Sequence, residues 1–227
     1  VISRQYDGII ISSGSFPADY VEQFTKAGIP VVVFRRWQRQ EYSGRVALLG
    51  TGLYQGARKA AEHLIACGCR HIVFADRISQ NGHASKPDDL KLRGVVDALE
   101  AAGMSLPQES MISGWHSHEE MAEAVKQKLK SGVKIDGIFG KDDSIAHTAM
   151  MAAIQSGFRV PEDIKVVGFD DSSISRFCSP SMTTIRVDQK NIAKTAIDML
   201  TKMVAGEQPE SVEFDSILIE RESTKVG

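Results

Sequence analysis

Cysteine is scarce in this sequence. Only Cys67, Cys69 and Cys178 occur among 227 residues, which is too few for the disulfide framework of a secreted domain. The spacing of Cys67 and Cys69, with one residue between them, fits neither a zinc site nor a redox motif. The thiols are therefore expected to be free, as in proteins of a reducing compartment such as the cytoplasm.

Long apolar runs and an excess of one charge are also missing. The sequence has no run of 18 apolar residues and opens with no signal-peptide pattern, so no membrane-spanning segment is expected. Its 27 basic and 29 acidic residues leave a net charge of −2, which disfavours nucleic-acid binding through bulk charge. The chain opens with Val1, not with methionine, directly before an apolar run. We therefore interpret it as part of a longer protein.

Short apolar runs and helical stripes alternate along the chain. The runs are typical of strands buried on both faces of a parallel sheet, and the stripes repeat at three and four residues as one apolar helix face does. This alternation predicts a doubly wound α/β architecture. The expected strands are 8–11, 31–34, 46–49, 71–75, 111–113, 137–140, 164–169 and 181–188. Two further β-rich segments, SVEF and SILIE, are expected near the C-terminus.

One glycine-rich stretch allows two interpretations. VALLGTGLYQGARKAAEHLI (46–65) carries Gly50, Gly52 and Gly56 before a helical pattern, and Asp76 ends the next apolar run. Glycines followed by a distant acid are typical of a dinucleotide-binding turn. However, the spacing is one residue longer than the common form, and two β-runs precede it. The alternative is a strand–turn–helix joint whose glycines permit tight packing.

Two pairs of acids follow predicted strands. Asp142 and Asp143 come after the 137–140 run, and Asp170 and Asp171 come after the 164–169 run. Ligands of open parallel sheets bind at the carboxyl ends of the strands. One acid of each pair has a simple role in capping the next turn or helix. Capping accounts for only one acid of each pair, so the other is a candidate for binding the hydroxyl groups of a polar ligand. Asp170 is the strongest of these candidates.

Other polar and aromatic residues follow strands as well. Trp115 either stacks on a sugar ring or fills a packing position, and Lys91 begins a helix after an irregular loop. The His116-x-His118 pair is more typical of a solvated helix start than of a metal site. No motif of a hydrolase supports catalysis, so no catalytic residue and no metal ligand is predicted.

Several motifs of the chain together resemble one family. The clearest is PEDIKVVGFDD at 161–171. The others are YDGIIIS (6–12), AGIPVVVF (27–34), AAEHLIACGCRHIVF (60–74), LRGVVDALEAAG (92–103), SMTTIRVD (181–188) and IERES (219–223). In their order and spacing, across nearly the whole chain, they resemble the effector-binding domain of the LacI/GalR family of bacterial transcriptional repressors.

The resemblance implies a two-lobed fold of the periplasmic-binding-protein type I, each lobe a mostly parallel sheet flanked by helices. Residues 1–76 and about 188–207 would form the N-terminal lobe, which would be incomplete. Residues 77–187 and about 208–227 would form the C-terminal lobe, and the DNA-binding domain would be absent. The implied effector contacts are Asp170, Trp115, Asp142 where many members have Asn, Lys91 where many have Arg, and Thr51 where many have Asp.

The family's function is implied in the same way. The chain would be no enzyme and would need no cofactor. It would bind a small effector, a sugar or sugar derivative, between its lobes in the cytoplasm. It would act as a homodimer and reach operator DNA through a helix-turn-helix domain. Two alternatives stay open: a periplasmic sugar-binding transport receptor of the same fold, and a nicotinamide-dependent enzyme that uses Gly50, Gly52, Gly56 and Asp76.

Overall fold

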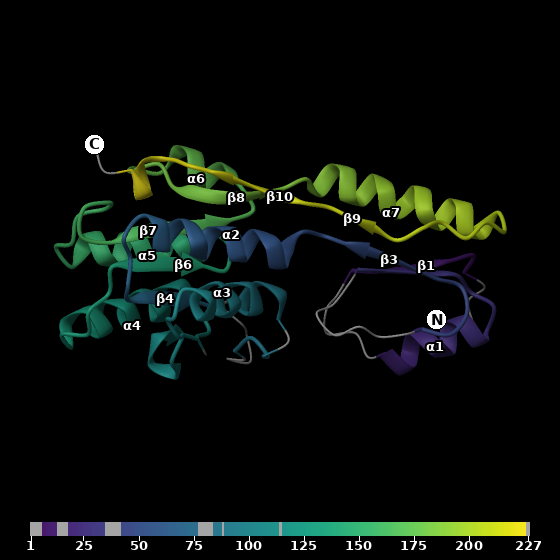
Figure 1. Cartoon of the computed structure of the whole chain (residues 1–227), viewed down its shortest axis with the longest axis horizontal. Helices are drawn as coiled ribbons and strands as arrows, with labels where there is room; N and C mark the ends of the chain where they lie inside the picture. The colour runs from purple at the N-terminus through teal and green to yellow at the C-terminus, as the bar shows by residue number, and fades with distance from the viewer. Residues whose placement is uncertain are drawn as a thin grey trace. The chain divides into compact units, whose positions relative to one another are not determined.

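The computed structural model describes residues 6–12, 18–34, 42–76, 84–87, 89–113 and 115–225. The chain divides into two units, each made from two separate stretches of sequence (Figure 1). The smaller unit comprises residues 1–52 and 188–215, and the larger unit comprises residues 53–187 and 216–227. Both are α/β units, so the predicted fold class is confirmed.

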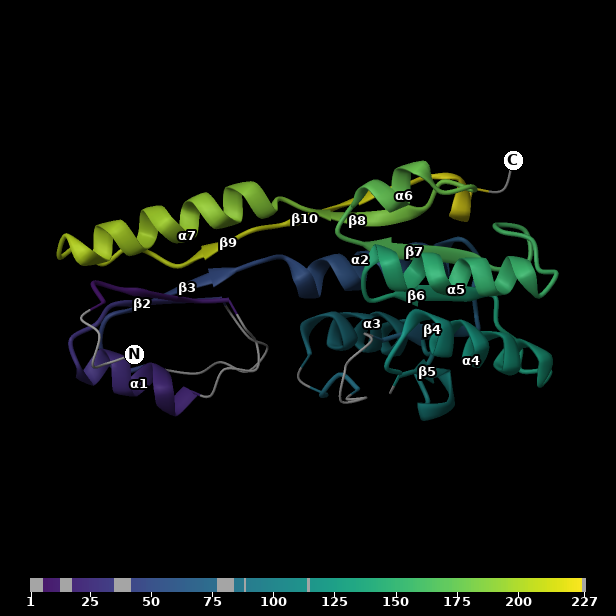
Figure 2. The ribbon, with the colours of Figure 1, turned by 180° about the vertical axis from the view of Figure 1, so that it is seen from behind.

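The smaller unit is a parallel sheet with a helix on each face. Its strand order is β1-β2-β3-β9, and every pairing is parallel. The strands are β1 (Ile9–Ile11), β2 (Val31–Phe34), β3 (Val46–Gly50) and β9 (Val212–Glu213). Figures 1 and 2 show α1 (Ala18–Lys26) and α7 (Gln189–Val204) on opposite sides of this sheet.

The larger unit contains a six-stranded sheet of order β10-β8-β7-β6-β4-β5. Among the described strands of this sheet, β10 alone runs antiparallel, against β8. The strands are β4 (Ile72–Ala75), β5 (Met111–Ile112), β6 (Gly137–Gly140), β7 (Lys165–Phe169), β8 (Thr183–Val187) and β10 (Ser216–Ile219). The helices are α2 (Leu53–Ala66), α3 (Leu90–Ala101), α4 (His118–Lys130), α5 (Asp143–Gln155) and α6 (Ser173–Phe177), with short 3-10 turns at Gln108–Ser110 and Glu222–Thr224.

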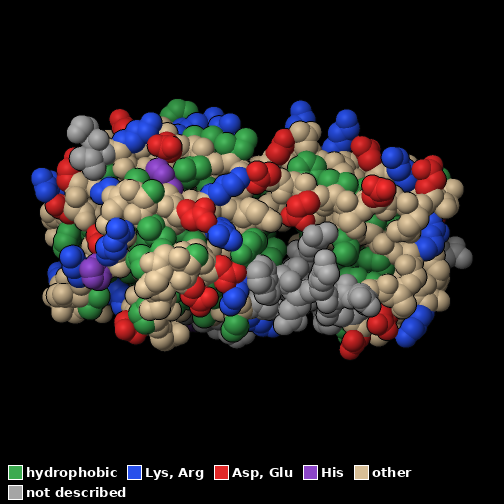
Figure 3. All heavy atoms as spheres, viewed as in Figure 1, with side chains coloured by type: hydrophobic (Ala, Val, Ile, Leu, Met, Phe, Trp, Pro, Cys, Tyr) green, Lys and Arg blue, Asp and Glu red, His purple; other side chains and the backbone are tan. Residues whose placement is uncertain are grey.

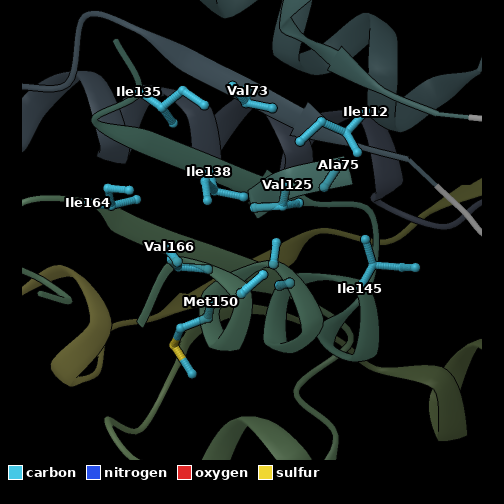
Figure 4. Close-up of a cluster of buried hydrophobic side chains, with 14 of the residues drawn as sticks. Val73, Ala75, Ile112, Val125, Ile135, Ile138, Ile145, Met150, Ile164 and Val166 are labelled. Atoms are coloured by element: carbon cyan, nitrogen blue, oxygen red, sulfur yellow. The ribbon is translucent and has the colours of Figure 1, made fainter. Parts of the chain in front are cut away.

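Alternation along the strands gives the larger sheet two buried faces. One face carries Val73, Ile138 and Val166, which pack with α4 and α5 in the cluster of Figure 4. The other carries Phe74, Phe139 and Phe169, whose rings pack in sequence across three neighbouring strands. Burial on both faces explains why these strands are continuous apolar runs in the sequence.

The observed division differs from the lobe boundaries expected from the sequence. Residues 53–76 were expected in the first lobe, but β4 pairs with β5 and β6 in the larger sheet. Helix α2 packs closely on that sheet too, since a Cβ atom at Gly56 would lie 2.8 Å from the Ile185 side chain and 2.9 Å from that of Phe169. Residues 208–215 were expected in the second lobe, but β9 pairs with β3 in the smaller sheet.

The close packing of α2 on α3 depends on a glycine. A Cβ atom at Gly94 would lie 2.4 Å from the carbonyl oxygen of Tyr54 and 3.0 Å from the backbone nitrogen of Arg58. We expect Gly94→Ala to lower the free energy of unfolding by about 1–2 kcal/mol, because overpacking outweighs the better helix propensity of alanine. Urea denaturation measures this, with the exposed Glu100→Ala as the control on the same helix. An unchanged stability of Gly94→Ala would contradict the observed packing.

Candidate functional site

The candidate site lies at the carboxyl ends of four parallel strands in the larger unit. Asp76 follows β4, Lys141 and Asp142 follow β6, and Asp170 follows β7, while Trp115 comes three residues after β5. Parallel pairing of β5, β4, β6 and β7 brings these strand ends to one edge of the sheet. This is the edge at which open α/β sheets bind ligands.

Lys91 and Asp170 form the centre of the site. The Lys91 ammonium lies 3.7 Å from Asp170 Oδ1 and 3.7 Å from the centroid of the Phe169 ring. It also donates a hydrogen bond of 2.8 Å to the carbonyl oxygen of Lys141. The Lys91 side chain is 12% exposed and that of Asp170 is 33% exposed. Asp170 is therefore the more accessible partner of the pair.

Burial shapes the ionisation of this pair. Burial lowers the pKa of Lys91 below its ordinary value, against the opposing negative charges of Asp170 and Asp142. Burial likewise raises the pKa of Asp170, with the charge of Asp142 adding to the rise and that of Lys91 opposing it. Each partner thus favours the charged form of the other, so the pair depends on both members.

Asp142 has two roles. Its Oδ1 accepts a 2.8 Å hydrogen bond from the backbone N–H of Ile145 and so caps α5, which is the capping role predicted for one acid of each pair. Its negative charge also acts on both Asp170 and Lys91. Asp142 therefore both caps α5 and contributes a negative charge that acts on Lys91 and Asp170.

Trp115 occupies a partly buried position beside the site. Its ring packs against the apolar cluster under α4 and α5, which is the packing role that the sequence analysis left open. Its indole N–H is buried and has no hydrogen-bond acceptor among the residues that the structure describes. Indole N–H groups in buried positions usually have a partner, so this atom is a candidate donor to a ligand.

Thr51 belongs to the smaller unit. It follows β3 directly and is buried, at 8% exposed. The other four predicted contacts, Asp170, Trp115, Asp142 and Lys91, all lie in the larger unit.

The second acid of each pair is structural. Asp143 is buried, and its carboxylate accepts hydrogen bonds from Thr184 Oγ1 (2.5 Å) and the backbone N–H of Ser172 (2.6 Å). The Asp171 carboxylate binds Arg221 (2.6 Å) and Arg186 (2.7 Å). Although burial acts to raise it, these two guanidinium groups hold the pKa of Asp171 below its ordinary value. Neither arginine was singled out from the sequence.

The turn after β7 has an unusual backbone. Asp170 has a φ of +98° and Asp171 a φ of +49°, in the left-handed region that L-residues other than Asn and Asp rarely adopt. Bonds on both sides fix this turn: the N–H of Asp170 donates to the carbonyl of Ile185 at 2.7 Å, and the arginines hold Asp171. The turn directs two consecutive carboxylates differently, Asp170 to Lys91 and Asp171 to the arginines.

Two of the glycines that suggested a nucleotide site lie closely against other side chains. The space beside Gly50 is filled by the Glu213 side chain, and Gly56 lies against Ser216, Ile185 and Phe169. The predicted ribose-binding acid, Asp76, is fully buried and accepts hydrogen bonds from the N–H (2.5 Å) and hydroxyl (2.7 Å) of Ser85. These contacts support the strand–turn–helix interpretation of the stretch.

His116 and His118 belong to no metal-binding group among the residues that the structure describes. Both ring nitrogens of His118 lie within hydrogen-bond distance of hydroxyls on α5, Thr148 Oγ1 at 2.7 Å and Ser144 Oγ at 3.3 Å. Across the described ranges, no group of three or more His, Cys, Asp or Glu side chains is arranged to hold a metal. On the face drawn in Figure 3, basic and acidic side chains are intermixed rather than gathered into a field of one sign.

Comparison with known proteins identifies the family. Residues 61–224 match the family model described as the periplasmic binding protein-like domain. The chain belongs to this family. Within it, the chain is similar to two curated transcriptional regulators. One is the HTH-type transcriptional repressor PurR of Actinobacillus pleuropneumoniae, 28% identical over 231 residues. The other is catabolite control protein A of Priestia megaterium, 27% identical over 229 residues. The resemblance to the LacI/GalR family is thereby confirmed.

Solved structures agree with this assignment of the periplasmic binding protein-like domain. A sugar-binding transcriptional regulator of the LacI family from Escherichia coli, complexed with phosphate, is 26% identical with a TM-score of 0.80; the match covers 98% of this chain and 78% of that one. The Escherichia coli transcriptional repressor ascG is 25% identical with a TM-score of 0.79, covering 98% and 79%. The two-lobed fold predicted from the sequence is confirmed.

The relatives of this periplasmic binding protein-like domain are longer than the chain. The matches cover 99% of this chain but only 66% of PurR and 67% of catabolite control protein A. Among the described helices, none is long and apolar enough to cross a membrane. Both curated relatives carry the names of regulators rather than of enzymes.

Proposed function

We propose that this chain is the ligand-sensing part of a LacI-type transcriptional repressor that works in the cytoplasm. A small effector, a sugar or sugar derivative, binds at the carboxyl ends of β4 to β7, against Asp170, Trp115, Asp142 and Lys91. The whole protein, as a homodimer, contacts operator DNA through a helix-turn-helix domain. The family match and the named regulators support this proposal.

One observation of the structure carries the proposed site. Asp170 is a partly exposed carboxylate held beside a buried lysine at the end of a central strand. A carboxylate in this setting accepts two directional hydrogen bonds from adjacent hydroxyl groups, which is the pattern that a sugar ring presents. The sugar-binding regulator of Escherichia coli, similar along 98% of this chain, supports the same ligand class.

The mechanism follows from differential binding. An effector that binds one conformation of the protein more tightly than another stabilises the conformation that it prefers. In the whole protein, the difference in effector affinity between two arrangements is the coupling free energy to DNA binding, typically about 1–3 kcal/mol. The chain described here supplies the sensing half of this coupling.

A ligand screen with a matched variant tests the proposal. The chain is heated with neutral sugars, sugar acids, sugar phosphates, nucleobases, NAD or NADP, each in large excess. A ligand at 100 times its dissociation constant stabilises the folded state by about 2.7 kcal/mol. We expect one class of sugar to raise the melting temperature of the wild type and to have no effect on Asp170→Asn. Asparagine is chosen because it tolerates the left-handed backbone of this position better than alanine does.

The control is Asp163→Asn, which removes a partly exposed carboxylate that is paired with the exposed Arg159. This variant should keep the full ligand response. A response to NAD or NADP alone would contradict the proposal and restore the nucleotide interpretation. A sugar response that survives in Asp170→Asn would show that the effector binds elsewhere.

A further inference from the structure

Lys141 occupies the centre of an ion cluster that neither the sequence motifs nor the proposed function accounts for. It follows β6 directly, and its ammonium reaches acceptors from other segments. It donates a 2.7 Å hydrogen bond to Asp89 Oδ2, lies 3.5 Å from Asp76 Oδ1 and contacts the hydroxyl of Ser85. The Lys141 side chain is only 13% exposed.

The contact with Asp89 links Lys141 to the start of α3. Asp89 is the N-cap of that helix, and its Oδ1 accepts the backbone N–H groups of Lys91 (3.1 Å) and Leu92 (3.2 Å). Its other oxygen, Oδ2, accepts the bond from Lys141. Through Asp89, Lys141 therefore holds the first turn of α3, which carries Lys91.

A second contact holds the other end of Lys91, its ammonium group. The Lys91 ammonium donates to the carbonyl oxygen of Lys141 at 2.8 Å. Lys91 is thus fixed at its backbone through Asp89 and at its tip through the main chain of Lys141. Between these two anchors, the ammonium lies over the Phe169 ring and beside Asp170.

We propose that Lys141 is a positioning residue, which holds Lys91 over Phe169 and beside Asp170 and thereby sets the geometry of the effector site. The part of this inference that concerns the effector rests on the proposed function. The placement of Lys91 does not, and it is measurable without any ligand.

The charges explain why a cation is needed at position 141. Asp76 is fully buried, and Asp89 lies close to it through their common partner, Lys141. Removing the cation would take away the ammonium group that these two carboxylates share. Losing one member of a buried or partly buried group of charges is strongly unfavourable. The segment that carries Ser85 and Asp89 would then shift to bring its carboxylates to water, and α3 would carry Lys91 with it.

The test compares Lys141→Met and Lys141→Arg by NMR of lysine-labelled protein at neutral pH, with the Lys91 signal assigned from Lys91→Met. The ring current of Phe169 shifts the methylene protons next to the Lys91 ammonium upfield. We expect Lys141→Met to lose this shift and the NOEs between Lys91 and Phe169. Lys141→Arg keeps a cation and should retain both. Lys126→Met, which removes a lysine paired with Glu123, should leave the Lys91 signal unchanged.

The same spectra separate positioning from simple charge. If Lys141 acts on Lys91 only through space, Lys141→Met changes the pH titration of Lys91 but leaves its contacts with Phe169 in place, and the proposal is wrong. If Lys141→Met does not fold, Asp89→Asn replaces it, because asparagine caps a helix about as well as aspartate but carries no charge for Lys141. A Lys91 signal that is unchanged in folded Asp89→Asn would also overturn the proposal.

The ligand readout is kept separate. If the screen yields a sugar, its affinity for Lys141→Met should fall while that for Lys126→Met does not. If the wild type binds no member of the panel but Lys141→Met still loses the Lys91 contacts, the proposed function fails and the placement of Lys91 by Lys141 stands. If a sugar binds with equal affinity to the wild type and to Lys141→Met, the role of Lys141 in the effector site is refuted.

Discussion

Phe139→Ala is expected to lower the free energy of unfolding by about 3–5 kcal/mol. Phe139 is fully buried on β6. Its ring centroid lies 5.6 Å from that of Phe74 and 6.3 Å from that of Phe169, the latter in an edge-to-face arrangement. Truncation removes both ring contacts and leaves a cavity in the middle of the sheet face. The Phe169 ring would lose its contact with Phe139. The ring under the Lys91 ammonium would then be held less firmly.

Chemical denaturation followed by circular dichroism measures this loss. The matched control is Phe177→Ala in the same unit, because the Phe177 side chain is 84% exposed. Its substitution should change the stability of the monomer by no more than about 0.5 kcal/mol. Equal effects of the two substitutions would contradict the observed core.

Asp171→Asn is expected to cost about 3–5 kcal/mol, the range for removing one partner of a buried ion pair. The Asp171 side chain is 5% exposed and that of Arg221 is 14% exposed. Arg221 would keep its hydrogen bonds to Met182 O and Ser175 Oγ but lose its counter-charge. Asp163→Asn breaks an ion pair with an arginine that is 70% exposed and should destabilise the protein far less.

The stabilising effect of Asp171 should depend on pH with a definite sign. Its pKa is lower in the folded state than in the unfolded chain, so the folded state binds fewer protons. The stability that Asp171 contributes is therefore complete well above its unfolded pKa, which is about 3.9. It is lost as the pH falls below that value toward the folded pKa. The difference in unfolding free energy between wild type and Asp171→Asn should shrink from pH 7 to pH 3. A constant difference would show that the charge of Asp171 is not what stabilises the turn.

Local features of the fold were predictable because they depend on neighbouring residues. The apolar runs at 31–34 and 137–140 became β2 and β6 with the expected bounds. Capping was predictable for the same reason, since Asp142 bonds to a backbone group only three residues away. The division into units was predicted less well. Residues 53–76 join the larger sheet through contacts such as that of Gly56 with Ile185, and no local pattern reports a partner so far along the chain.

In the candidate site, too, the positions of the residues were predictable and their distant partners were not. The strand-end positions of Asp170, Asp142 and Trp115 follow from the order of apolar runs and polar residues. What each side chain binds does not follow from that order. Asp171 meets an arginine 50 residues away, and Lys141 meets Asp89 52 residues away. Long flexible side chains reach such partners only after the sheet has aligned its strand ends, so sequence spacing gives no sign of the pairing.

The discontinuous make-up of the two units has a consequence for how the chain is synthesised. Strand β8 ends at Val187, but its partner β10 begins at Ser216, after α7 and β9 of the smaller unit. The hydroxyl of Ser223, which bonds to the carbonyl of Val166 inside the larger unit, emerges later still. A ribosome-bound chain that has reached residue 215 therefore carries an open β-strand edge on β8, and open edges are sites of aggregation and chaperone recognition. Only when residues 216–219 emerge can the nascent chain cover that edge itself.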